Sequence, residues 1–249
     1  MKSDISKAVV VFDLDGLLVD SQELGRQAVN VALRSLGETT EVTPDIWYEQ
    51  FILQGGSSGL TSRAYVARLL GTEDLAPFRI ARDAAWVELL RTQTLPIYPD
   101  ALEFSKWCRT NCRAIGIATN NDLSLLQLIL EKTEYGRLFG NNYVSAKALG
   151  IQKPDPRVLS ETLLTMNIPD PDSLIVVGDT LPDHELAENF SALSKYPVRS
   201  IIRPDPYLKN FKAASETPVR GNLVCNSLFE AMDNESRILS LFASRGIER

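Results

Sequence analysis

An apolar run at residues 9–12, VVVF, that ends in two carboxylates limits what this chain can fold into. β-Branched residues without polar alternation predict a strand buried on both faces, as in a parallel sheet. Asp13 and Asp15 follow directly, and Gly16 ends the strand. Open α/β sheets bind ligands beyond the carboxyl ends of their strands, and two neighbouring carboxylates repel one another. The segment therefore predicts a site for a divalent cation that prefers oxygen ligands.

On its own, the pattern Asp13-x-Asp15-Gly16 is equally consistent with a turn that merely ends a strand, because Asp and Gly are common turn residues. The strand that precedes it and three later segments of the chain favour the site.

Composition excludes several classes of protein. The 249 residues are 44% hydrophobic and 23% charged, which is typical of a globular chain with one large domain or two modest ones. The net charge is -6 and no Lys/Arg-rich run occurs, so no nucleic acid partner is expected. No apolar stretch approaches the roughly 20 residues that cross a bilayer. The N-terminal apolar run is cut by carboxylates and is not a signal peptide. We expect a cytoplasmic protein without a membrane partner, either a monomer or a homodimer.

Residues 17–95 show helical periodicity and no convincing strand. The spacing of apolar residues, with Gly and Pro at the boundaries, predicts four helices. These are expected at about 21–36, 44–53, 63–70 and 76–91, with a small, flexible stretch at 54–62.

From residue 96 onward, apolar strands alternate with helices. Strands are expected at 114–118, 143–145, 174–177, 198–202 and 222–225, and helices at 100–110, 122–133, 156–166 and 182–190. Such alternation indicates βαβ units. The predicted fold class is α/β, with a Rossmann-like parallel sheet formed by residues 1–16 and 96–249 and an inserted helical domain at 17–95. Residues 204–221 are expected to form an irregular surface excursion.

Polar residues follow four of the predicted strands. They are Asp13 and Asp15, then Thr119 and Asn120, then Lys153, and finally Asp179 and Asp183. In a parallel sheet these strand ends converge at one edge. Carboxylates, one ammonium, one hydroxyl and one amide form a set that suits a phosphate bridged to a metal ion.

Four motifs occur in order along the chain: DLDGLLVDS, IATN, QKPDP and GDTLPD. Together they resemble the haloacid dehalogenase superfamily, and within it the β-phosphoglucomutase and phosphoglycolate phosphatase-like hydrolases. The resemblance covers almost the whole chain. The inserted helices look like the C1 cap domain of that family, which follows the first motif.

The resemblance implies roles for these residues. Asp13 would be the nucleophile that forms an aspartyl-phosphate, and Asp15 the general acid and then the general base. Mg²⁺ would be held by the Asp13 carboxylate, the Asp15 backbone carbonyl and Asp179. Asp183 would support the metal site directly or through water.

The remaining motif residues would contact the phosphoryl group. Thr119 and Asn120 would hold its oxygens, and Lys153 would balance charge. Each has an alternative that the residues leave open. Thr119 and Asn120 suit an N-cap of the next helix, Lys153 suits a solvated surface, and Asp183 suits the first turn of a helix.

The expected reaction is hydrolysis of a phosphomonoester, because dehalogenases of the superfamily lack an acid at the position of Asp15. Phosphonate hydrolysis uses a cap lysine, and no lysine lies between Lys7 and Lys106. The mutases that the chain resembles use a histidine and a lysine in the cap, and this cap has neither. A sugar phosphomutase of the β-phosphoglucomutase type remains the alternative, beside a non-catalytic binding protein on the same fold.

The substrate is expected to be a small phosphorylated metabolite chosen by the cap. Gly55 and Gly56 are candidate specificity-loop residues, although these glycines suit a plain helix connection equally well. Arg63 is a candidate substrate-binding residue, and the arginine-rich cap suggests an anionic leaving group. The segment after Asp183 lacks the Ala-Gly ending of relatives with this cap.

Overall fold

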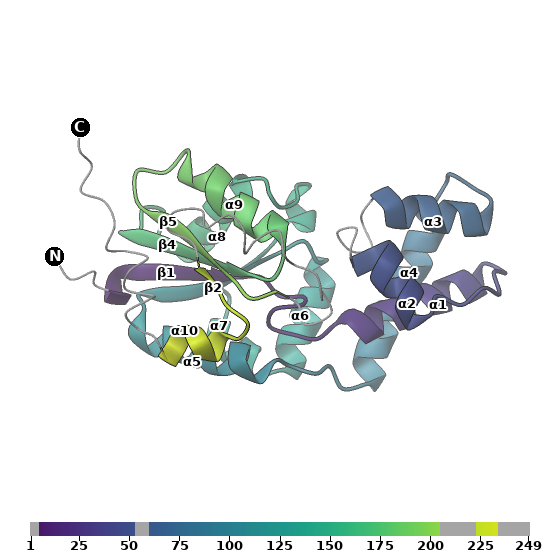
Figure 1. Ribbon diagram of the computed structural model, residues 1–249, viewed down its shortest axis with the longest axis horizontal. Coiled ribbons are helices and arrows are strands. Elements are labelled where there is room, and N and C mark those ends of the chain that lie inside the picture. Colours follow the sequence, from purple (N-terminus) through teal and green to yellow (C-terminus); the bar gives the residue numbers. More distant parts are fainter. Residues whose placement is uncertain (1–4, 53–59, 205–222, 234–249) are drawn as a thin grey trace. The chain divides into compact units, whose positions relative to one another are not determined.

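The computed structural model describes residues 5–52, 60–204 and 223–233 (Figure 1). Its backbone contacts divide the chain into two compact units. The described residues of the first unit are 5–19, 97–204 and 223–233, and those of the second lie within Asp20–Pro96. Each unit is described separately.

A parallel sheet forms the centre of the first unit. Over the described residues it has six strands in the order β3-β2-β1-β4-β5-β6 (Figure 1). The strands are β1 Ala8–Phe12, β2 Ala114–Thr119, β3 Tyr143–Ser145, β4 Ser173–Gly178, β5 Val198–Ile202 and β6 Leu223–Val224. β1 is central, and Phe12 pairs with Ile117 of β2 and Val177 of β4. The prediction of a parallel α/β sheet is confirmed.

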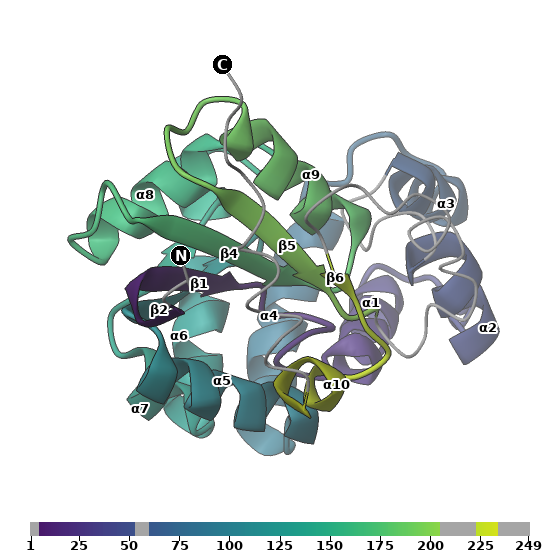
Figure 2. The same ribbon diagram turned by 60° about the vertical axis from the view of Figure 1, so that its left-hand side comes forward.

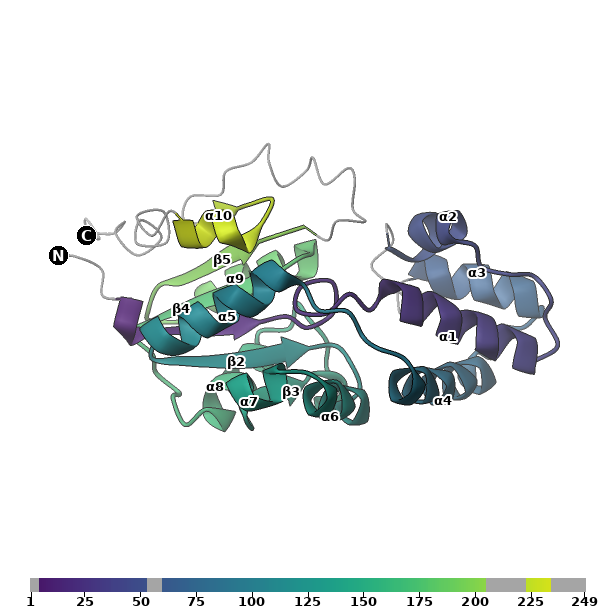
Figure 3. The same ribbon diagram turned by 90° about the horizontal axis from the view of Figure 1, so that it is seen from below.

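Helices cover both faces of this sheet. Figure 2 shows α8 and α9 on one face and α5, α6 and α7 on the other. The helix α10 lies along α5 (Figure 3). Their bounds are α5 Pro99–Asn111, α6 Leu123–Lys132, α7 Tyr135–Phe139, α8 Arg157–Thr165, α9 Leu181–Ser191 and α10 Leu228–Asp233. Two 3₁₀ turns, Ile5–Lys7 and Lys147–Leu149, are also present.

Side chains of β1 enter the cores on both faces. Val9 and Val11 belong to a cluster with residues of α8 and α9. Phe12 points to the other face, where its ring lies 6.0 Å from Phe104 and 5.6 Å from Phe139. Every residue of β1 is fully buried, and full burial of each large apolar side chain contributes about 1.5–3 kcal/mol. The unbroken apolar run is what such a strand requires.

The second unit is helical throughout its described residues. Its elements are α1 Gln22–Ser35, α2 Pro44–Trp47, a π-helical segment Tyr48–Ile52, α3 Leu60–Leu70 and α4 Ala76–Thr92. Its core contains Trp47 stacked on Phe51 at 4.6 Å, with Tyr65 edge-on to Phe51. α3 begins three residues before the predicted start at Arg63, and Ser62 within this added turn is buried.

The chain passes between the units twice, and the two connecting segments pair with each other at the end of the first unit. Val19 forms a bridge with Ile97, and the N–H of Tyr98 donates to the carbonyl of Leu18 at 3.1 Å. Asp20 and Pro96, the ends of the helical insert, are likewise joined by a backbone hydrogen bond of 2.9 Å. The chain therefore leaves and re-enters along neighbouring paths.

Two further points of the sequence analysis differ from the structure or fall outside it. The helix α7 was not predicted, because five residues are too few to show a period, and its Tyr135 and Phe139 bury themselves four positions apart. The predicted excursion at 204–221 lies almost entirely outside the described residues. Among the described helices, none is long and apolar enough to span a membrane.

We predict that Gly178→Ala destabilises the protein. A Cβ at this position would overlap Cβ and Cγ of Asp183 and lie 2.5 Å from its Oδ2. Overpacking of this kind costs about 1–3 kcal/mol. The matched control is Gly116→Ala in β2, where the nearest atom is Sδ of the flexible Met166 side chain and the nearest backbone atom, the Asn142 carbonyl oxygen, is 3.2 Å away. A smaller loss is expected there. Urea unfolding would contradict the prediction if both variants lost equal free energy of unfolding.

Candidate active site

Asp13 is fixed at the carboxyl end of the central strand. Its backbone N–H donates to the carbonyl of Val177 at 2.8 Å, so the pairing of β1 with β4 continues to this residue. β4 ends at Gly178, and Asp179 follows. Two carboxylates are thus brought side by side by the register of adjacent parallel strands.

Three carboxylates form a buried cluster at this edge. Asp13, Asp179 and Asp183 each offer an oxygen, and the three oxygens lie within 4.8 Å of one another. The residues are 9%, 3% and 1% exposed. Buried charges of one sign need compensation, so the cluster requires a cation.

Lys153 supplies one positive charge to the cluster. Its Nζ donates to Oδ1 of Asp13 and, at 2.6 Å, to Oδ1 of Asp183. Its backbone N–H donates to Oδ1 of Asn120 at 2.8 Å. The side chain is buried, so the alternative of a solvated surface lysine is wrong.

The pKa values reflect this crowding. Burial raises the pKa of Asp13 to about 7; Lys153 opposes the rise, while Asp183 and Asp15 add to it. Burial disfavours the charged form of Lys153, but the carboxylates of Asp13 and Asp183 raise its pKa above the ordinary value. The cluster itself holds three carboxylates and one ammonium, so the positive charge of Lys153 does not balance them.

The donor set fits a hard divalent cation. Carboxylate oxygens are the ligands that Mg²⁺ and Ca²⁺ take, and here three clustered carboxylates face one ammonium, that of Lys153. Asp13, Asp179 and Asp183 are therefore the described residues that could hold a divalent cation.

Asp183 also holds the start of α9. Its Oδ2 accepts hydrogen bonds from the Thr180 N–H at 3.2 Å and the Thr180 hydroxyl at 2.7 Å. Asp183 therefore both stabilises the first turn of α9 and belongs to the carboxylate cluster. Its two oxygens are divided between Thr180 and Lys153, which fixes the carboxylate.

Asp15 is oriented by a residue that the sequence analysis did not identify. Oδ2 of half-buried Asp15 accepts a hydrogen bond from Nδ2 of Asn121 at 3.0 Å. The carbonyl of Asn121 in turn accepts from the Ser145 hydroxyl at 2.6 Å. The one sequence signal for Asn121 is its position beside Asn120 at a strand end.

Thr119 and Asn120 lie where the motif predicts but do not cap α6. Asp122 is the N-cap, and its Oδ1 accepts from the Ser124 N–H at 3.1 Å. The capping alternative for Thr119 and Asn120 is therefore wrong. Thr119 is buried with its Oγ1 accepting from the Asn121 N–H, and Asn120 is exposed.

The predicted substrate-binding residues belong to the helical insert and not to the first unit, which holds the cluster. Gly55 and Gly56 lie outside the described residues. Arg63 lies on α3 of the second unit with an exposed side chain, and its role stays a prediction.

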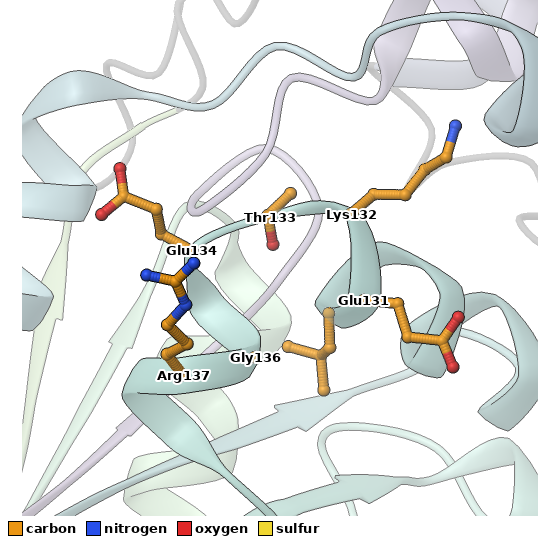
Figure 4. Close-up of a pocket in the computed structure, with 7 residues that line it drawn as sticks. Glu131, Lys132, Thr133, Glu134, Gly136 and Arg137 are labelled. Carbon is orange, nitrogen blue, oxygen red and sulfur yellow. The ribbon is translucent and has the colours of Figure 1, made fainter.

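A surface hollow of about 490 Å³ lies elsewhere in the first unit, where α6 meets α7 (Figure 4). It is lined by charged side chains that include Lys132 and Glu134, which point away from each other in Figure 4. None of the predicted site residues lines it. The convergence of charged groups, and not this hollow, therefore defines the candidate active site.

Comparison with known proteins agrees with this geometry. The family model of the haloacid dehalogenase-like hydrolases matches residues 7–190. The chain therefore belongs to that family, as the four motifs predicted, and it is an enzyme of the hydrolase class.

Two relatives of the chain carry phosphatase names. Hexitol phosphatase B of Escherichia coli is 24% identical over 214 residues, which are 80% of this chain and 85% of that protein. Phosphoglycolate phosphatase 1 of Pseudomonas aeruginosa is 28% identical over 180 residues, which are 70% and 63% of the two chains. The crystal structure of CbbY from Rhodobacter sphaeroides in complex with phosphate has a TM-score of 0.68 at 18% identity, covering 89% and 95%. This last likeness shows the shared fold.

We predict that Lys153→Met destabilises the protein strongly in the presence of chelator. Removal of one partner from a buried charge cluster typically costs about 3–5 kcal/mol, because the remaining charges stay buried. The control is Lys147→Met, whose exposed ion pair with Asp122 at 3.2 Å is expected to contribute less than about 1 kcal/mol. Urea unfolding measures both. Equal losses would show that the cluster does not depend on Lys153.

Proposed function

We propose that this protein is a Mg²⁺-dependent phosphatase that hydrolyses a small phosphomonoester through an aspartyl-phosphate. The observation that carries the proposal is the junction of Asp13, Lys153, Asp179 and Asp183 at one strand edge. A dianionic phosphate meeting a carboxylate nucleophile needs positive charge around it. Lys153 supplies one positive charge at this edge, and a metal ion held by the carboxylates would supply more. The phosphatase names of the relatives support the same reaction.

Asp13 would act as the nucleophile. Its carboxylate attacks phosphorus, and the bond from phosphorus to the leaving oxygen breaks. Asp15 donates a proton to that oxygen as it leaves. Asp15 then accepts a proton from the water that attacks the aspartyl-phosphate, which releases phosphate and regenerates Asp13. The hydrogen bond from Asn121 supports this assignment because it directs the Asp15 carboxyl.

The neighbouring residues would bind the phosphoryl oxygens. The Thr119 hydroxyl accepts from Asn121 N–H and retains its own proton to donate. Asn120 uses its Oδ1 for Lys153, and its amide NH₂ suits a phosphoryl oxygen. Asp13, the Asp15 carbonyl and Asp179 would hold Mg²⁺, with Asp183 in support. The bound ion would neutralise charge on the phosphoryl group.

The substrate would be a small phosphorylated metabolite selected by the helical insert, acting as a C1 cap. Two of its arginines already have partners within the second unit: Arg26 pairs with Glu23 at 2.7 Å, and Arg82 with Asp83 at 2.7 Å. Arg63 is exposed on α3. We favour Arg63, because it lies closest in sequence to the predicted loop at Gly55 and Gly56, as the group that contacts the leaving portion of the substrate.

Asp13→Asn is expected to lower phosphate release by at least about a thousandfold, because it removes the nucleophile. The assay uses p-nitrophenyl phosphate and a panel of hexitol, sugar, nucleotide and organic-acid phosphates, with Mg²⁺. Asp172→Asn is the control, since Asp172 is exposed and precedes β4 at its opposite end. Turnover that survives in Asp13→Asn would exclude this mechanism. A wild type that interconverts sugar phosphates without releasing phosphate would favour the mutase.

Mg²⁺ is expected to raise the melting temperature of the wild type, and Asp179→Asn to abolish that rise. A ligand that binds only the folded state stabilises it by about 2.7 kcal/mol at 100 times Kd. Differential scanning calorimetry with Mg²⁺ and with chelator measures the shift, and Asp172→Asn again serves as control. An equal Mg²⁺ shift in Asp179→Asn would place the cation elsewhere.

A further inference from the structure

Arg203 is a fully buried cation that the proposed reaction does not use. It follows β5 directly, and only 2% of its surface is exposed. A guanidinium is costly to bury unless its donors and its charge are matched. Its contacts therefore indicate what the residue does.

Arg203 binds the backbone just after Asp15. Its Nη2 donates to the carbonyl of Leu17 at 2.6 Å and to that of Gly16 at 3.1 Å. Its own N–H donates to the carbonyl of Gly178 at 3.0 Å, one residue before Asp179. One residue thus joins the segment that carries the predicted acid to the strand end that carries a predicted metal ligand.

The segment that Arg203 binds is a tight turn. The Gly16 N–H donates to the carbonyl of Val19 at 2.9 Å, and the N–H groups of Leu18 and Val19 donate to that of Leu14. Gly16 has a φ of +77°, a conformation that glycine adopts without strain. The carbonyls of Gly16 and Leu17 are thereby directed at the guanidinium.

The charge of Arg203 is matched on its other side. Its Nε lies 3.7 Å from Oδ2 of Asp100, and its guanidinium carbon lies 4.3 Å from the centre of the Tyr98 ring. Asp100 is itself held, because its Oδ2 accepts from the Ser227 hydroxyl and from the Leu228 N–H. The guanidinium therefore sits in a built site and has little freedom to move.

We propose that Arg203 is a positioning residue for Asp15. It fixes the turn that begins at Asp15, while Asn121 fixes the carboxyl group itself. The inference rests on the proposed phosphatase function, in which Asp15 exchanges protons with the leaving group and with water. Arginine suits this role because one guanidinium nitrogen donates to both carbonyls while the planar group stacks on the Tyr98 ring, and a lysine ammonium cannot stack in this way.

The expected signature is a loss in kcat with little change in KM. Asp15 acts on the leaving oxygen in the transition state, so its displacement removes stabilisation that the bound substrate does not feel. Displacements of a fraction of an ångström to 1 Å cost up to about a hundredfold. Arg203→Lys is expected to lose about tenfold in kcat and Arg203→Met about a hundredfold, each with KM within about twofold of the wild type.

The experiment measures kcat, KM, melting temperature and amide hydrogen exchange in the wild type and both variants. Exchange at Gly16, Leu18 and Val19 should accelerate, because their N–H groups close the turn. Leu163→Ala is the control: this buried α8 residue belongs to the cluster on the α8–α9 face. It should lower the melting temperature without lowering kcat or loosening the turn.

The outcomes separate the inference from the proposed function. A wild type that releases no phosphate overturns the proposed function. An active wild type whose Arg203→Lys variant keeps its kcat, or loses no more than Leu163→Ala, overturns the positioning role alone. If Arg203→Met fails to fold, Arg203→Lys and Asp100→Asn decide by the same measurements, since the latter removes the counter-charge and keeps the shape.

Discussion

The structure of the site depends on one ammonium group held between two carboxylates. Lys153 bridges Asp13 at the end of β1 and Asp183 at the start of α9. Without it, parallel strands that deliver several acids to one edge would leave like charges buried together. With it, three clustered carboxylates still face a single ammonium, and burial, with smaller contributions from Asp183 and Asp15, raises the pKa of Asp13. Lys153 therefore does not neutralise all the carboxylates of the site, and a divalent cation would balance the remaining negative charge.

Most of the fold and much of the site could be predicted from local patterns. The apolar run before Asp13 predicts a central strand because burial on both faces leaves no place for polar residues. The polar residues at strand ends could be placed together because parallel strands share one edge. Family membership followed from the same motifs and was confirmed by the match over residues 7–190.

What could not be predicted depends on pairs far apart in sequence. Asn121 reaches Asp15 across 106 residues, and Arg203 reaches Gly16 across 187. No period or spacing signals such a pair, because each partner alone is consistent with an ordinary loop. The helix α7 was not predicted for a different reason: it is stabilised by the burial of Tyr135 and Phe139, and it is too short to show a helical pattern.

The paired crossings at Val19 and Ile97 carry a consequence for how such a protein can diverge. The two ends of the insert are held side by side by the first unit. Lengthening the insert therefore adds little to the entropy cost of closing the loop between them. The helical unit can therefore be lengthened, rebuilt or exchanged while the register of β1 with β4 stays intact. Under the proposed role of the insert in substrate selection, substrate range and chemistry can then evolve at separate rates within one chain.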